Sequence, residues 1–191
     1  MSQDGLIRFV DDPKQKYMFN CGEGFVVDTL PEGTRVLYPR KPLPPLEDVN
    51  GAIENALENP LDAEPLSSQL RPGMKVTIAF DDISLPLPPM QTPDIRELVI
   101  TKLLEKLGAG GVDDIHLICA VSLHRRMTPQ ELKRVLGHRI YHHFAPDRLY
   151  NHDAEDKDNN VFMGETEKGE VVELNRRAVE SDLLIYVNIN L

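Results

Sequence analysis

Residues 76–82 read VTIAFDD and residues 115–126 read IHLICAVSLHRR, so each of two apolar stretches runs into residues that can carry or exchange a proton. Short apolar runs of this length are typical of buried strands in parallel sheets. In an open α/β sheet, ligands bind at the edge formed by the carboxyl ends of the strands. If the two stretches are neighbouring parallel strands, a carboxylate of Asp81 or Asp82 and the imidazole of His124 therefore emerge at the same edge.

The segment between the two stretches predicts a helix that crosses from one strand to the next. Thr92 suits the N-cap, Pro93 the first helical position and Asp94 the first turn, while Gly108 suits the end of the helix. Strand, helix and strand in this order form a βαβ unit. Its apolar face is predicted to consist of Ile95, Leu98, Val99, Leu103 and Leu107.

A second helix start follows His124. Thr128 and Pro129 again fit the N-cap and the first helical position, and Glu131 is placed to close a capping box on Thr128. We expect this helix to finish at Gly137. The loop that carries His124 then lies between two rigid elements, the strand before it and this helix after it.

The remaining sequence predicts two parts. Residues 1–45 read as short strands joined by turns, followed by a proline-rich connector. Residues 46–191 are predicted to form an α/β domain with a mostly parallel sheet, flanking helices and a Rossmann-like core. Within it, residues 183–187 are expected to add a third buried parallel strand.

Composition excludes several classes of partner. The chain has 21 basic and 31 acidic residues, a net charge of −10, so it repels phosphate backbones and we expect no nucleic-acid partner. No stretch approaches the roughly 20 apolar residues of a membrane span, and the N-terminus does not resemble a signal peptide. We expect a cytoplasmic protein without a membrane partner.

The metal-binding residue types are few and poorly spaced. Cys21 and Cys119 are too few for a zinc site or a disulfide framework. His142, His143 and His152 lack the i, i+4 spacing that metal-binding histidines adopt on a helix. We predict no metal site within this chain.

The candidate catalytic residues are His124 and one of the two adjacent aspartates, Asp81 or Asp82. An imidazole, with an ordinary pKa of about 6.5, can accept or deliver a proton at physiological pH, and a carboxylate can orient it. The alternatives are that the two adjacent aspartates only cap the loop after the strand, and that His124 is an exposed loop residue. Successive side chains of an extended chain point oppositely, so only one aspartate need face the cleft. The candidate substrate- or cofactor-binding residues are Asp81, Ser84, Arg125 and Arg126.

Four segments in order resemble the N-terminal domain of the nickel-dependent lactate racemase (LarA-type) family. They lie at residues 80–88, 123–132, 151–153 and 172–185. The family's first loop reads approximately Asp-x-Thr-Arg-Pro and its second Gly-x-His-Arg-Pro. The resemblance thus places Asp82 at the active-site aspartate and His124 at one of two catalytic histidines. Leu85 stands where the family has the arginine that grips the substrate carboxylate, and Arg126 replaces the family's proline.

The resemblance implies a racemase or epimerase that acts on a small 2-hydroxy acid. Hydride passes to a nickel-pincer nucleotide tethered to a lysine, and a histidine takes the hydroxyl proton. The family's second histidine, tethering lysine and nickel-binding histidine lie beyond residue 191. We therefore expect a fragment that is inactive alone, binds no cofactor covalently and works with the C-terminal remainder of the same protein.

Two other functions remain open from the sequence. A non-catalytic ligand-binding or partner-docking module would have kept the fold and lost the chemistry, and Leu85 favours this alternative. A metal-free hydrolase would need a nucleophile, but neither Ser84 nor Ser122 lies in a nucleophile-elbow pattern.

Overall fold

A computed structural model describes residues 6–21, 24–84 and 90–189, and the chain divides into two units, residues 1–46 and 47–191. The first unit consists of two antiparallel strand pairs. Among its described residues, Val10 is the only buried side chain, so these strands bury little apolar surface. The pairs are β1 (Ile7–Phe9) with β4 (Arg35–Leu37) and β2 (Lys16–Cys21) with β3 (Gly24–Thr29).

The second unit is built on a parallel sheet, as the sequence predicts. Its strand order is β10-β5-β6-β7, and the register places Phe80 beside both Cys119 and Val187. The two apolar stretches are therefore neighbours whose carboxyl ends share one edge of the sheet. The strands are β5 (Lys75–Phe80), β6 (Asp114–Cys119), β7 (Leu149–Asn151) and β10 (Leu183–Val187).

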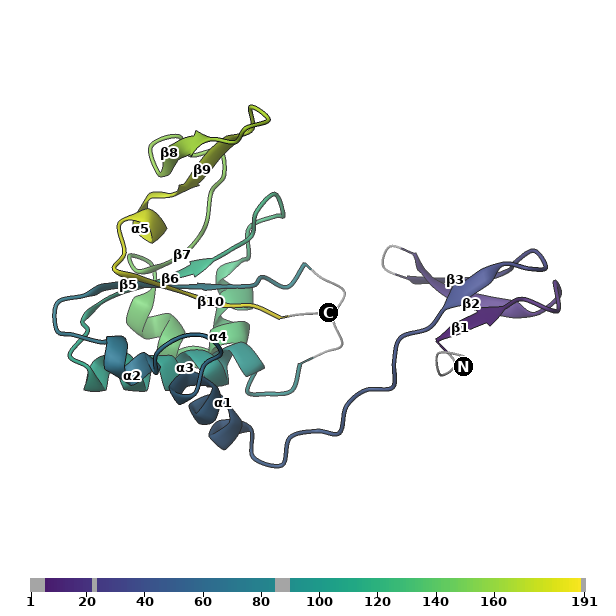
Figure 1. The fold of residues 1–191 in the computed structure, drawn as a ribbon, viewed down its shortest axis with the longest axis horizontal. Coiled ribbons are helices and arrows are strands. Elements are labelled where there is room, and N and C mark those ends of the chain that lie inside the picture. Colours follow the sequence, from purple (N-terminus) through teal and green to yellow (C-terminus); the bar gives the residue numbers. More distant parts are fainter. Residues whose placement is uncertain (1–5, 22–23, 85–89, 190–191) are drawn as a thin grey trace. The chain divides into compact units, whose positions relative to one another are not determined.

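Helices cover one face of this sheet (Figure 1). They are α1 (Val49–Glu58), α2 (Leu66–Gln69), α3 (Ile95–Ala109) and α4 (Pro129–Phe144). The hairpin of β8 (Asn160–Glu165) and β9 (Val171–Asn175) and the short α5 (Arg176–Val179) lie on the other side. The core lies between sheet and helices, where burial of each large side chain contributes about 1.5–3 kcal/mol. Its fully buried members include Val76, Ile78, Phe80, Ile100, Leu103, Leu107, Leu117 and Leu136.

Two local predictions, the start of α3 and the burial of β10, are wrong in detail. α3 begins at Ile95 because Asp94, not Thr92, is the N-cap and accepts a hydrogen bond from the backbone N–H of Arg96. β7 was not foreseen, since three residues are too few to show a period. β10 is an edge strand rather than a buried one: Leu184 and Tyr186 are 50% and 54% exposed.

α4 begins with the predicted capping box between Thr128 and Glu131 but does not finish at Gly137. Gly137 interrupts the helix with φ of 75° and ψ of 162°, and a second helical segment continues to Phe144. The glycine is needed because a residue with a Cβ rarely adopts this φ. A pattern read as a helix end is therefore a break between two helical segments.

We expect Gly137→Ala to lower the free energy of unfolding by about 1–3 kcal/mol, the cost of a residue with a Cβ in a backbone region that is essentially restricted to glycine. The added methyl group would also meet the Glu97 carboxylate, which would have to move. Urea denaturation measures the change. Gly108→Ala is the matched control: it lies in α3 with open space around the new Cβ, and should raise stability by about 0.5–1 kcal/mol. A neutral or stabilising Gly137→Ala would contradict the argument.

Within the described ranges, none of the helices has both the length and the apolar character required to cross a bilayer.

Candidate functional site

Asp82 and His124 meet at the carboxyl edge of the sheet. Asp82 follows β5 and His124 follows β6, and Nδ1 of His124 lies 2.9 Å from Oδ2 of Asp82. Ser84 joins them: its hydroxyl donates to Oδ1 of Asp82 at 2.8 Å and lies 2.6 Å from Nδ1 of His124. The structure therefore brings together three of the six candidate site residues, Asp82, Ser84 and His124.

The hydrogen bonds of this cluster determine which ring nitrogen of a neutral His124 is the base. A carboxylate can only accept hydrogen bonds, so Nδ1 carries the hydrogen that Asp82 accepts, and the lone pair lies on Nε2. Among the described residues, no group is bonded to Nε2. The His124 side chain is 46% exposed, whereas that of Asp82 is 5% exposed. A buried carboxylate thus orients a half-exposed imidazole.

Asp81 points away from this cluster and links the end of β5 to β10 by hydrogen bonds. Its Oδ1 accepts the hydroxyl of Tyr186 at 2.6 Å, and its Oδ2 accepts the backbone N–H of Ile189 at 2.6 Å. The hydrogen bond to Asp81, followed by burial, raises the pKa of Tyr186 to about 12. Both carboxylate oxygens are therefore engaged within the chain. The binding role of Asp81 stays a prediction.

Arg125 and Arg126 lie at the surface, and each contacts a carboxylate. Arg125 binds Glu131 through two hydrogen bonds of 2.9 and 2.7 Å, and Arg126 binds Asp153. Their side chains are 62% and 65% exposed, so a ligand could still reach them. Their role in binding an anion also stays a prediction. Leu85 stands where the resemblance places the family's carboxylate-binding arginine, and it lies outside the described residues.

Glu131 gives this region a pH dependence. Its hydrogen bonds with Arg125 and then with the backbone of Thr128 lower its pKa to about 2. A carboxyl group with a lowered folded-state pKa stabilises the fold above its unfolded value of about 4.3, and this contribution is lost as the pH falls towards 2. Glu131→Gln keeps a side chain able to complete a capping box but removes the charge.

We therefore expect the wild type to have a higher free energy of unfolding than Glu131→Gln at pH 7. The difference between the two free energies should become smaller as the pH falls from 5 to 2.5. Urea midpoints at several pH values measure it. Glu155→Gln, at an exposed carboxylate, is the control and should show a smaller gap at pH 7. A gap that widens on acidification would contradict the assignment.

Sequence reasoning missed Arg96, which lies directly beneath the site. Its side chain is 3% exposed and donates to the backbone carbonyl oxygens of both Asp81 and Asp82. A signal was present: Arg96 stands at i in a helical i, i+4, i+7, i+11 series with Ile100, Leu103 and Leu107, all buried. Because charged residues are rarely buried, an arginine in such a series does not by itself predict a buried side chain.

Asn151 was also missed, although it holds the other side of the site. Its Oδ1 accepts the backbone N–H of Met127, and its Nδ2 donates to the carbonyl oxygen of Met127, each at 2.9 Å. The amide thus ties β7 to the loop that carries His124. The sequence offered only an asparagine near a histidine, which is typical of a turn.

The described residues do not provide a metal centre by themselves. Over residues 6–21, 24–84 and 90–189, no group of three or more His, Cys, Asp or Glu side chains could hold a metal ion. Cys119 is buried in the core, and burial raises the pKa of its thiol to about 12, so it is not a ready thiolate ligand.

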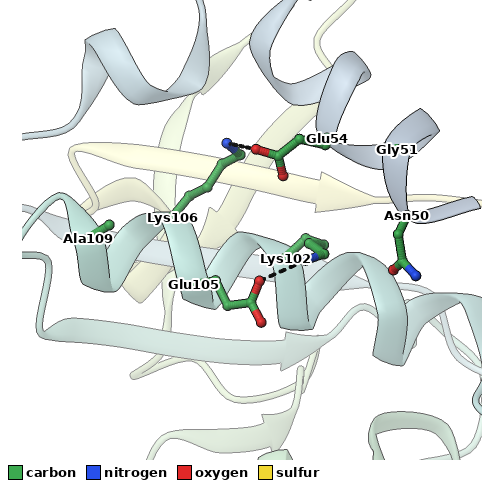
Figure 2. Close-up of a pocket in the computed structure, with 7 residues that line it drawn as sticks. All are labelled: Asn50, Gly51, Glu54, Lys102, Glu105, Lys106 and Ala109. Carbon is green, nitrogen blue, oxygen red and sulfur yellow. Dashed lines mark hydrogen bonds and ion pairs between the residues drawn. The ribbon is translucent and has the colours of Figure 1, made fainter.

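Two surface hollows lie beside the helices and the hairpin. The larger, of about 460 Å³, is lined by α1 and α3 (Figure 2). Lys106 of α3 binds Glu54 of α1 there (Figure 2) and also Glu58, so these pairs tie the two helices together, whereas Lys102 and Glu105 pair within α3. The second, of about 340 Å³, adjoins the site, since Asn151 and Asp153 line it.

The sequence model of the lactate racemase N-terminal domain family matches residues 23–191. The chain belongs to this family. The lactate racemase of Thermoanaerobacterium thermosaccharolyticum is 26% identical over 133 residues, which cover 70% of this chain and 29% of that protein. This confirms the resemblance seen in the sequence.

One solved structure supports the fold. The lactate racemase apoprotein of the same organism superposes with a TM-score of 0.63 and 22% identity, over 90% of this chain and 38% of that chain. A Thermotoga maritima protein matches over 72% of this chain and 32% of its own, with 18% identity and a TM-score of 0.47. The chain thus spans well under half the length of the relatives it matches.

Proposed function

We propose that this chain is the N-terminal domain of a racemase or epimerase that acts on a 2-hydroxy acid, with His124 as general acid and base. One observation carries the proposal: Asp82 holds Nδ1 of His124 at the carboxyl edge of the sheet and leaves Nε2 for a substrate. Membership of the lactate racemase N-terminal domain family supports it.

In this proposal Nε2 of His124 takes the proton of the substrate hydroxyl group and later returns it. Asp82 keeps the ring in the required tautomer and stabilises the imidazolium that forms. Ser84 completes the support, because its hydroxyl and its backbone N–H both donate to Oδ1 of Asp82 and fix that carboxylate. General acid–base catalysis of this kind contributes about 10²- to 10⁴-fold in rate.

The family resemblance implies a nickel-pincer nucleotide, which when bound supplies the hydride acceptor. The described residues of this chain do not fit the metal, as they contain no cluster of ligands for it. We propose that its ligands come from the C-terminal remainder of the longer protein. The role of the present residues is then limited to orienting the substrate and moving its hydroxyl proton.

Arg126 is the better candidate for the substrate carboxylate. Arg125 is held by two hydrogen bonds to Glu131, which also forms the capping box of α4. Arg126 has an ion pair with Asp153, whose side chain is one-third exposed. A surface pair is worth little and exchanges readily, so a 2-hydroxy acid can replace Asp153 on the guanidinium.

The geometry does not support hydrolysis. In a serine hydrolase triad the nucleophile and the acid bind opposite nitrogens of the histidine ring. Here Ser84 and Asp82 both lie at Nδ1. Ser84 therefore supports the acid and is not placed to be activated by the base.

Stereochemical assays of the longer protein, produced in cells that make the cofactor, test the function. Single enantiomers of 2-hydroxy acids, carrying deuterium at carbon 2, are incubated with it and separated by chiral chromatography. We expect inversion with deuterium retained at carbon 2, as hydride transfer requires. Loss of deuterium to water would contradict hydride transfer, and absence of inversion for every acid would favour the non-catalytic ligand-binding module.

A further inference from the structure

We propose that Arg96 is a positioning residue that shapes the loop after β5 so that Asp82, and not Asp81, is presented to His124. The consequence for catalysis rests on the proposed function, whereas the geometric part does not. Among the described residues, the Arg96 side chain makes its hydrogen bonds to the Asp94 carboxylate and to the carbonyl oxygens of Asp81 and Asp82, so it acts through the backbone of the two aspartates.

The contacts of Arg96 explain how the loop leaves the strand. A single nitrogen, Nη1, donates to the carbonyl oxygen of Asp81 at 2.9 Å and to that of Asp82 at 2.7 Å. In an extended strand successive carbonyl groups point to opposite sides. Two carbonyls that converge on one atom therefore require the chain to turn at this point. Past the turn, Asp81 faces Tyr186 and Asp82 faces His124.

The guanidinium itself has a fixed position. Its Nε donates to Oδ1 of Asp94 at 2.9 Å and its Nη2 to Oδ2 at 2.8 Å, and both side chains are almost completely buried. Asp94 is also the N-cap of α3. A buried charge that loses its partner is costly, so Arg96 cannot swing away. The start of α3, the ion pair and the aspartate loop thus form one rigid unit.

This arrangement has a consequence that a purely structural residue would not have. If Asp82 moves away, Nδ1 of His124 loses its acceptor. In water a neutral histidine favours the tautomer with hydrogen on Nε2. His124 would then carry hydrogen on the nitrogen that has to accept the substrate proton. The tautomer of His124 therefore reports the positioning role directly.

The test is Arg96→Lys in the 191-residue chain, labelled with ¹⁵N-histidine and observed by long-range ¹H–¹⁵N NMR at a pH where the rings are neutral. We expect the wild type to show His124 mainly with hydrogen on Nδ1. A lysine retains the charge for Asp94 but lacks the planar fork that reaches both carbonyl groups. We expect the ratio of the Nδ1–H to the Nε2–H tautomer to fall at least about fivefold in the variant.

Arg177→Lys is the matched control. Arg177 is also largely buried, binds the Asp114 carboxylate at 2.7 Å and donates to the carbonyl oxygen of Asp114 at 3.0 Å, near the start of β6. It should lose stability without a change in the His124 tautomer. An unchanged ratio in Arg96→Lys, or an equal shift in both variants, would overturn the proposal.

A second variant covers the case in which Arg96→Lys does not fold. Asp94→Asn keeps Arg96 and the N-cap but loosens the guanidinium. It should shift the tautomer ratio in the same direction by a smaller factor, and an unchanged ratio would reject the proposal. The readout does not depend on turnover. An inactive longer protein with a normal His124 tautomer would therefore reject the racemase assignment and leave the role of Arg96 intact.

Discussion

His124→Ala is expected to reduce the racemisation rate of the longer protein, loaded with cofactor, by about 10²- to 10⁴-fold, because the variant loses its general base. The fold should survive. His124 is half-exposed, and its side chain bonds only Asp82 and Ser84 among the described residues. The effect should appear in kcat, measured by chiral separation of the product, with little change in KM or in the urea midpoint.

His143→Ala is the control for this prediction. His143 is exposed near the end of α4, and its ring packs on Phe144 rather than on the site. The variant should retain wild-type turnover. Normal activity in His124→Ala, or an equal loss in both variants, would contradict the assignment of the base.

The sheet could be predicted because its two central strands are recognisable from their own short stretches of sequence. Residues 76–80 and 115–119 are almost continuously apolar, which suits burial on both faces. β7 and the edge position of β10 depend instead on pairing between distant segments. β7 has three residues, and β10 joins β5 across more than a hundred residues. No local pattern contains that information.

The meeting of Asp82 with His124 could be predicted for the same reason, since both follow neighbouring strands. The residues alone do not decide which of the two aspartates faces the cleft. That choice depends on where the chain turns after β5, and the turn is made by Arg96 from α3. A buried arginine is hard to recognise when its only sequence signal is a place in an apolar series.

The two helix corrections have a similar origin. Thr92 and Asp94 are both residue types that favour the N-cap. Asp94 is the N-cap in the structure, where its carboxylate also binds the Arg96 side chain. Gly137 is a typical helix end by composition. In the fold, however, apolar residues on both sides of it, such as Leu136 and Ile140, pack into one core, so the helix resumes.

Asp82→Asn is expected to lower kcat by up to about 10⁴-fold, and by no more than His124→Ala does, because the histidine then adopts the wrong tautomer. With its oxygen still bonded to Ser84, the amide presents its NH₂ group to Nδ1 of His124. That group donates, so Nδ1 has to accept and the ring hydrogen moves to Nε2. Stability should change little, because the oxygen keeps the hydrogen bonds from the Ser84 hydroxyl and backbone N–H.

Asp81→Asn separates the orienting aspartate from its neighbour. At Asp81 the amide can keep its oxygen on the Ile189 backbone N–H only by turning its NH₂ group towards the Tyr186 hydroxyl, which would then accept instead of donate. The variant thus replaces two hydrogen bonds to a charged carboxylate with weaker neutral ones and should lose some stability. It should nevertheless keep hydrogen on Nδ1 of His124, whereas Asp82→Asn should not. Kinetics of the longer protein and histidine NMR of the 191-residue chain measure the two effects independently. Equal losses of kcat in both variants, with an unshifted His124 tautomer, would show that neither aspartate orients the base. The acid–base chemistry at the carboxyl edge would then have to be carried out by another pair of residues.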